Sequence, residues 1–167
     1  MTANVLTPQR SPISGSQGDR RPRFAAPWNI AMSVSVNAER HRLFQALTLP
    51  EYMEAWMRIP GFRDNEQIAV TCTSESYRIL ASDSHGMQVS IAGVYRVSRR
   101  GKMIFTWKKG PAPNAGLSLV TIRLIGDFAR TTLLLSHGGL LSKTEYNWHR
   151  AFWEGSLGRL QSLFQSH

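Results

Sequence analysis

The sequence predicts an α+β fold in which a curved antiparallel β-sheet of about six or seven strands wraps around one long C-terminal helix. Three observations lead to this prediction. Segments that alternate apolar and polar residues follow one another from residue 67 to residue 137. Helical periodicity is confined to two short segments after the first strand and one long segment at the end of the chain. Strands that follow one another without intervening helices favour antiparallel pairing.

The first strand and the two short helices are expected between residues 29 and 57. Ile30 begins an alternation of apolar with small or polar residues that continues to Val36, which is typical of a half-buried strand. Asn37 is expected to be the N-cap of a helix over residues 38–47. Pro50 is expected to open a second short helix, because proline is tolerated in the first helical turn.

Six further strands fill the middle of the chain. They are expected at residues 67–74, 76–82, 87–97, 103–109, 117–125 and 131–137. Gly101 lies in the turn between the third and fourth of these strands, where it is available for a positive φ angle. Gly93 lies inside a strand, and a glycine there can mark a bulge that reverses which side chains face the core.

The long final helix is expected to begin after Ser142. Ser142 and Glu145 form an S-x-x-E capping box. Gly155 and Gly158 are expected to let the helix approach the sheet closely. The apolar stripe of this helix consists of Tyr146, His149, Trp153, Leu157, Leu160 and Phe164. One helix packed on one large curved sheet leaves a groove or cavity between them.

Length and composition indicate a single domain. The chain has 167 residues, of which 42% are hydrophobic, and it has no apolar run near the ~20 residues of a membrane span. We expect residues 1–28, which are basic and rich in proline and serine, to be a disordered tail, and residues 29–167 to form the domain. Cys72 is the only cysteine, so no internal disulfide can form, and the cytoplasm is the simplest location.

The basic surplus raises the question of an anionic partner, because the net charge is +9. Basic residues gather in two places, namely the tail (Arg10, Arg20, Arg21, Arg23) and the hairpin over residues 96–109 (Arg96, Arg99, Arg100, Lys102, Lys108, Lys109). No helix-turn-helix, zinc-finger or RNA-recognition motif accompanies them, so nucleic acid is not favoured. A solvated hairpin and a protein partner bound through the basic hairpin both remain open, as do a monomer and a dimer.

Four segments together resemble the activator-of-Hsp90-ATPase-like family, a branch of the START-like (SRPBCC) superfamily. They are IAGVYRVSRRGKMIFTW (91–107), SLVTIRL (118–124), LLLSHGGL (133–140) and HRAFWEGSLGRL (149–160). The resemblance covers about residues 29–164 and implies the helix-grip fold of that superfamily. Because the superfamily includes lipid carriers, polyketide cyclases and plant hormone receptors, it implies a fold more firmly than a function.

The resemblance implies a domain that binds a small apolar or amphipathic ligand between the sheet and the C-terminal helix. The residues expected to line this cavity are Trp56, Tyr77, Ile91, Tyr95, Phe105, Trp107, Thr121, His137, Trp148, Phe152 and Trp153. Phe152 departs from the family pattern, since such helices often have glycine before the tryptophan. Its ring could fill the cavity instead of leaving it open.

Two other functions stay open. A cyclase or aromatase-type enzyme would place His137, Tyr95 or Arg123 near a hydrophobic substrate, and a chaperone-regulating domain would bind a partner protein. His137, Glu145 and His149 could also hold zinc or iron. The simpler hypothesis is that His137 fixes the strand-to-helix turn and Glu145 caps the helix, so we assign no catalytic residue, metal or cofactor.

Overall fold

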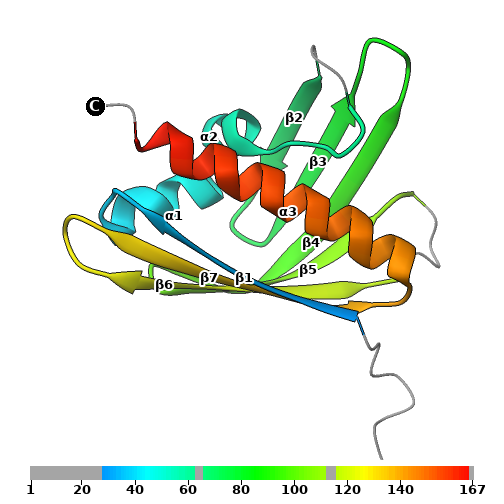
Figure 1. Ribbon diagram of the computed structural model, residues 1–167. Helices are drawn as coiled ribbons and strands as arrows, with labels where there is room; N and C mark the ends of the chain where they lie inside the picture. Colours follow the sequence, from blue (N-terminus) through cyan, green and yellow to red (C-terminus); the bar gives the residue numbers. More distant parts are fainter. Residues whose placement is uncertain (1–27, 63–65, 112–115, 166–167) are drawn as a thin grey trace, which may run out of the picture.

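The computed structural model describes residues 28–62, 66–111 and 116–165, which contain seven strands and three helices (Figure 1). In chain order these are β1 (Trp28–Val36), α1 (Arg40–Thr48), α2 (Pro50–Trp56), β2 (Gln67–Cys72), β3 (Ser76–Ser82), β4 (Gln88–Arg99), β5 (Lys102–Lys109), β6 (Ser118–Gly126), β7 (Thr131–Leu140) and α3 (Lys143–Leu163). The strands form one antiparallel sheet in the order β1-β7-β6-β5-β4-β3-β2. The predicted α+β architecture is confirmed. Trp28, the last residue of the predicted tail, is the first residue of β1, and residues 1–27 lie outside the described residues.

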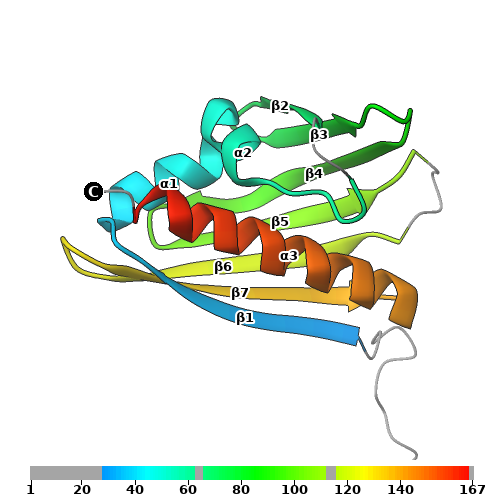
Figure 2. The same ribbon diagram turned by 45° about the horizontal axis from the view of Figure 1, so that its top comes forward.

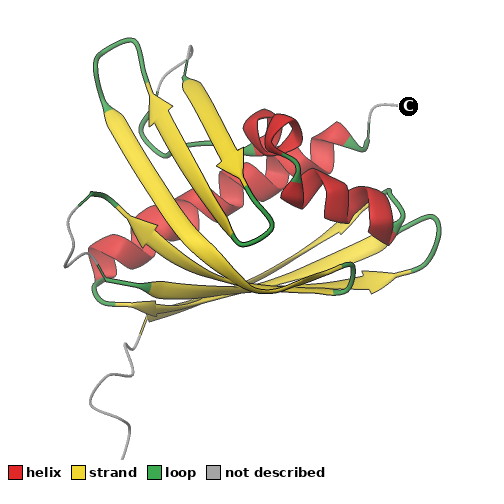
Figure 3. Ribbon diagram, turned by 180° about the vertical axis from the view of Figure 1, so that it is seen from behind, coloured by secondary structure: helices red, strands yellow, loops and turns green. Residues whose placement is uncertain are grey.

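All three helices lie on one face of the sheet, and α3 runs diagonally across it (Figures 1 and 2). We call this the inner face. It carries the buried residues of each strand, such as Val120 and Ile122 of β6 and Leu133 and Leu135 of β7. The residues between them in sequence point to the outer face, over which no described helix lies (Figure 3). The core is therefore the single layer between the inner face and the helices.

Strands β2–β4 lean away from the rest of the sheet (Figures 1 and 3). Gly93 lies inside β4, where this strand runs beside β5. A β-carbon at Gly93 would lie 1.8 Å from the carbonyl oxygen of Thr106, so only glycine permits this approach. Tyr77 donates its hydroxyl proton to that oxygen at 2.6 Å, and the backbone N–H of Val94 bonds the Thr106 hydroxyl at 2.9 Å. The register shift between β4 and β5 falls after Tyr95, so the predicted bulge at Gly93 itself is wrong.

The short helices begin differently from one another. Helix α1 starts at Arg40 with Glu39 in the N-cap position and no side-chain cap, so the predicted cap by Asn37 is wrong. Helix α2 has Pro50 in its first turn, as predicted. The indole nitrogen of Trp56 donates to the carbonyl of Ala46 at 2.8 Å, which fixes the angle between the two helices.

Helix α3 begins as predicted, because the Ser142 hydroxyl accepts a hydrogen bond of 3.1 Å from the Glu145 backbone N–H. Two glycine predictions fail. A β-carbon at Gly158 would meet no atom within 4 Å, so this position does not let the helix approach the sheet. Gly101 is not among the described glycines with a positive φ angle.

Candidate functional site

The inner face brings six of the predicted cavity residues together around the centre of the core. They are Trp56, Tyr77, Tyr95, Phe105, Trp107 and Trp153. The space they enclose measures only about 20 Å³. A single water molecule needs roughly 10–15 Å³ measured in this way, whereas ligand pockets usually span roughly 300–1,000 Å³. The predicted interior cavity is therefore closed, and these side chains form a packed core.

Phe152 packs against two of these side chains. Its side chain is fully buried, and its ring centroid lies 5.3 Å from that of Trp107 and 4.9 Å from that of Trp153. On its other side it stacks on Trp148, with an interplanar angle of 11°. The Phe152 ring therefore occupies space among the aromatic side chains of the core, where a smaller residue would leave a void.

Other predicted residues lie elsewhere. Ile91 is buried but does not line the central space. Thr121 and Arg123 alternate with the buried residues Val120 and Ile122, so they point to the outer face, away from α3. Their predicted places near a ligand or substrate are wrong. The sequence could not fix which set of alternating side chains in β6 faced the core.

His137 is locked into a buried chain of hydrogen bonds. The indole N–H of Trp153 donates to its Nδ1 at 2.9 Å, so that nitrogen carries no proton. Its Nε2 lies 2.7 Å from the Ser118 hydroxyl, which itself donates to the carbonyl of Trp107 at 3.1 Å. Nε2 must therefore be the protonated nitrogen. Burial, and then the nearby His149, lower the pKa of His137 from its ordinary 6.5 to about 3, which holds the ring neutral.

In His149 the donating and accepting ring nitrogens are exchanged relative to His137. Its Nδ1 donates to the carbonyl of Glu145 at 2.7 Å, which leaves Nε2 to accept the indole N–H of Trp107 at 3.0 Å. Burial lowers the pKa of His149, and the Glu145 backbone and carboxylate oppose this only in part. Each histidine thus accepts one indole N–H and donates one proton. We call these four side chains the His–Trp network.

The network explains what the predicted trio of His137, Glu145 and His149 does. The two imidazole centroids lie 4.9 Å apart, so the structure does bring the histidines together. All four ring nitrogens are used within the protein, and no buried side-chain nitrogen or oxygen of the described residues lacks a partner. In the parts of the chain that the structure describes, no group of three potential ligands could hold a metal ion. These contacts are those of structural histidines.

Two phenols lie on the sheet side of the core. Tyr77 uses its hydroxyl for the Thr106 carbonyl, and burial raises its pKa well above the ordinary value. Burial also raises the pKa of Tyr95, whose ring packs on Tyr77 at 5.5 Å. Both phenols therefore stay protonated at neutral pH and act as packing groups.

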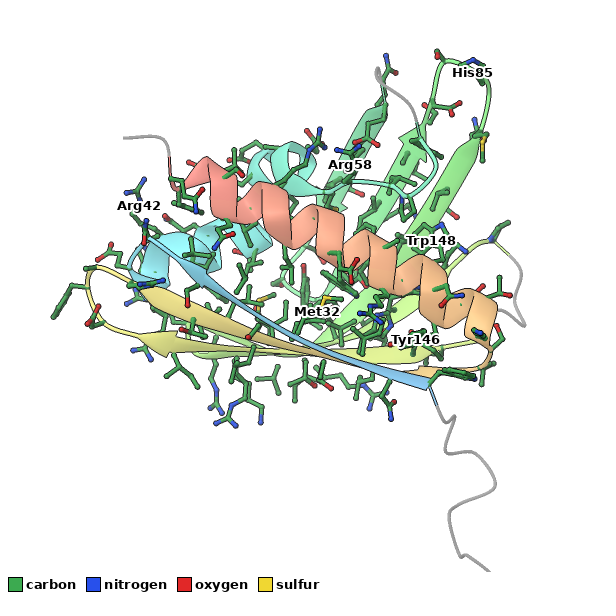
Figure 4. The ribbon with its side chains drawn as sticks, in the orientation of Figure 1. Met32, Arg42, Arg58, His85, Tyr146 and Trp148 are labelled. Carbon is green, nitrogen blue, oxygen red and sulfur yellow. The ribbon has the colours of Figure 1, made fainter. Side chains whose placement is uncertain are left out.

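A hollow opens at one end of the His–Trp network, between the first turn of α3 and the ends of β5 and β7. It measures about 140 Å³. We call it the mouth, and its lining is Trp107, Lys109, Gly116, Ser118, Gly139, Leu140, Leu141, Glu145 and His149. At its opening, Nζ of Lys109 lies 3.7 Å from the carboxylate of Glu145 and 4.3 Å from the ring centre of Trp148. Trp148 lies on α3 (Figure 4).

Lys109 and Ser118 were not among the predicted site residues. A signal for Lys109 was present, because it continues the alternation of Phe105 and Trp107 along β5 and so shares their face. Ser118 gave no such signal, since a single serine at a strand start is common in any β protein. None of the described helices is long and apolar enough to cross a membrane.

Comparison with known proteins identifies the family. Residues 37–165 match the family described as "Activator of Hsp90 ATPase homolog 1-like protein". Among solved structures, the chain resembles protein CV1439 from Chromobacterium violaceum, with a TM-score of 0.71 and 18% identity over 84% of this chain and 100% of that one. It also resembles the AHSA1 protein SPO3351 from Silicibacter pomeroyi, with a TM-score of 0.66 and 14% identity over 81% and 96% of the two chains.

A third similar structure is DynU16, a protein in the dynemicin biosynthetic locus, with a TM-score of 0.59 and 22% identity. The match covers 83% of this chain but only 47% of DynU16. A search of curated protein sequences returned no match. Identities this low show a shared fold and no more. The family match spans most of the chain, and the protein therefore belongs to the activator of Hsp90 ATPase homolog 1-like family and has a helix-grip fold.

Proposed function

We propose that this domain binds a small amphipathic ligand at the mouth. The observation that carries the proposal is the hollow of about 140 Å³, whose walls include Trp107 and His149 and whose opening holds Lys109 and Glu145. A cavity of roughly 150 Å³ accepts a molecule the size of benzene. The mouth therefore suits one aromatic ring that carries one charged group, which would pack on Trp107 and leave its charge at the opening.

An anionic group is favoured over a cationic one. The ammonium of Lys109 lies over the Trp148 ring, and the Lys109 side chain as a whole is 27% exposed. A carboxylate bound there would replace the long 3.7 Å contact with Glu145 by a direct charge-assisted hydrogen bond. The net charge of +9 would also favour the approach of an anion.

Titration with single-ring probes tests this proposal. Benzoate, benzylamine and hexanoate would be added separately while the indole N–H resonances are followed by NMR. We expect benzoate to shift the Trp107 resonance and to bind about tenfold more weakly to a Lys109→Met variant. Lys108→Met is the matched control, because the neighbouring side chain points to the outer face. The proposal would be refuted if none of the three probes shifted the Trp107 resonance. It would also be refuted if both lysine variants lost the same affinity for benzoate.

A further inference from the structure

One end of the molecule gathers two hairpin turns and the start of a helix. The turn between β4 and β5, the turn between β6 and β7, and the start of α1 all lie at the end opposite the mouth (Figures 1 and 2). The backbone N–H of Leu124 donates to the carbonyl of Gly101 at 3.0 Å, which ties the first turn to β6. The Thr131 hydroxyl donates to the carbonyl of Ala38 at 2.8 Å, which ties β7 to the segment before α1. We call this part of the surface the basic end.

The β6–β7 turn presents an aromatic side chain to solvent. Phe128 is 92% exposed, and Ile125 beside it in the hairpin is 53% exposed. The turn itself is well fixed, because the Asp127 carboxylate accepts hydrogen bonds from the N–H groups of Ala129 and Arg130 at 3.0 and 3.1 Å. Phe128 is thus held outward by a bonded turn rather than by a loose loop, although nothing in the described structure packs on it.

Three cations form a row on the outer face of the sheet at the basic end. Arg99 pairs with Lys102 across β4 and β5, and Lys102 pairs with Arg123 across β5 and β6, so three like charges lie side by side on the outer face. Such cross-strand neighbours repel one another and lower stability. The other cations of the basic end are Arg40, Arg42, Arg100 and Arg130.

Few negative charges oppose these cations. The seven described strands contain no aspartate or glutamate. The acidic residues of the basic end are Glu39, which precedes α1, and Asp127, whose carboxylate is bonded into its own turn. None of the described carboxylates forms an ion pair with Arg99, Lys102 or Arg123. The repulsion in this row would be relieved by an anionic partner.

We propose that the basic end docks on the surface of an anionic phospholipid bilayer, with Phe128 and Ile125 entering the layer of headgroups. Peripheral binding of this kind combines burial of apolar side chains with attraction of nearby cations to anionic lipids. A projecting aromatic side chain needs a medium that can close around it, which a bilayer provides and a rigid acidic protein surface does not. The proposal is independent of the mouth, which lies at the other end of β5 and stays free.

Vesicle sedimentation with the full chain tests this proposal. The vesicles would be phosphatidylcholine alone, or phosphatidylcholine in which about a third is replaced by phosphatidylglycerol. We expect binding to the anionic vesicles alone, and its loss at high salt. Phe128→Ala should weaken the partition coefficient about tenfold, because a phenyl ring is no longer buried. The double variant Arg99→Glu/Lys102→Glu should weaken it at least about tenfold through lost attraction.

Matched control positions lie away from the basic end. Leu117, which is 60% exposed, precedes β6 and lies roughly 30 Å from its far end, so Leu117→Ala controls for loss of an exposed apolar side chain. Arg78 and Lys108 flank Ala92 in one row of the outer face, so Arg78→Glu/Lys108→Glu makes the same change in net charge. The arginines of residues 1–27 are present in every variant, so their contribution to vesicle binding is the same on both sides of each comparison.

Three results would overturn the proposal. One is equal binding to neutral and anionic vesicles. Another is that the control variants lose as much vesicle affinity as the variants at the basic end. The third is that the protein binds soluble poly-glutamate as tightly as it binds anionic vesicles, with no loss of affinity in Phe128→Ala. That result would assign the basic end to an acidic protein partner. Since Phe128 is exposed, its variant should keep the melting temperature of the parent protein, so weakened binding would not reflect unfolding.

Discussion

The indole nitrogen of Trp153 lies 2.9 Å from Nδ1 of His137, and this hydrogen bond requires the imidazole to be neutral. The same relationship holds between Trp107 and His149 at 3.0 Å. A proton added to either accepting nitrogen would replace a bond with a repulsive contact between two donors, in surroundings too dry to solvate the new charge. The network therefore couples the stability of the fold to pH.

Stability should fall as the pH is lowered below about 6.5. The pKa of His137 is about 3 in the folded protein and near 6.5 when the chain unfolds, so between these values the unfolded state binds more protons. The contribution is fully present above pH 6.5 and is lost progressively toward pH 3. Protonation linked to His137 alone should lower the free energy of unfolding by up to about 1.4 kcal/mol for each pH unit. His149 acts in the same direction, because its pKa is also lowered in the folded protein.

Urea unfolding between about pH 7.5 and 5.5 measures this slope above the range in which most carboxylates titrate. His137→Leu should reduce the slope, because it removes a group whose pKa differs between the folded and the unfolded state. An identical slope in His137→Leu and the parent would contradict the assignment.

Removing one indole N–H should destabilise the protein and free a histidine to titrate. Trp107→Phe keeps an aromatic ring but leaves the buried Nε2 of His149 without its donor, which should cost about 1–3 kcal/mol. The pKa of His149 should rise, since the neutral form loses its hydrogen bond. NMR titration of the imidazole resonances gives this pKa directly. Trp28→Phe is the control, because the half-buried Trp28 packs on Tyr146 at 5.4 Å outside the network; a similar loss of stability there would argue for packing alone.

Most of the fold could be predicted from the sequence, because most of its elements depend on local patterns. Alternation such as that of Phe105 and Trp107 depends only on strand geometry, and the Ser142 cap on a local hydrogen bond. The start of α1 was misplaced because the cap position there is filled without any side-chain bond. Periodicity alone left two choices of face for β6, and Thr121 was assigned to the wrong one.

The site was less predictable because it depends on contacts between distant segments. Trp107 and His149 are 42 residues apart in sequence, and their hydrogen bond requires one relative position of β5 and α3. No periodicity encodes that geometry. The closure of the cavity likewise depends on how Trp56, Tyr77 and Trp153 pack against one another from separate elements, which only the folded chain determines.

Truncating Phe152 should open the groove that its ring fills. Phe152→Ala removes a fully buried ring between Trp107 and Trp148 and should cost about 3–5 kcal/mol of unfolding free energy. The same variant should gain thermal stability when benzene is added, because an apolar cavity of that size binds small apolar molecules. Phe128→Ala, at a 92% exposed position, should show neither effect. If Phe152→Ala kept the full free energy of unfolding, or if benzene did not raise its melting temperature, the neighbouring rings would have collapsed into the space.

Two glycines should respond to alanine in opposite ways. In Gly93→Ala the new methyl group would lie 1.8 Å from the Thr106 carbonyl oxygen and 2.7 Å from the Tyr77 hydroxyl, so β4 and β5 would have to separate. We expect a loss of about 3 kcal/mol or more. In Gly158→Ala the methyl group meets no atom within 4 Å and replaces glycine inside α3, which should stabilise the protein by about 0.5–1 kcal/mol.

Urea unfolding of both variants at neutral pH measures the contrast. Equal effects at the two positions would mean that glycine matters in this chain only through backbone entropy. The opposite signs that we expect would instead locate its role in the close contact among Tyr77, Gly93 and Thr106, which lets the Tyr77 hydroxyl reach the Thr106 carbonyl while its ring lines the central space of the core.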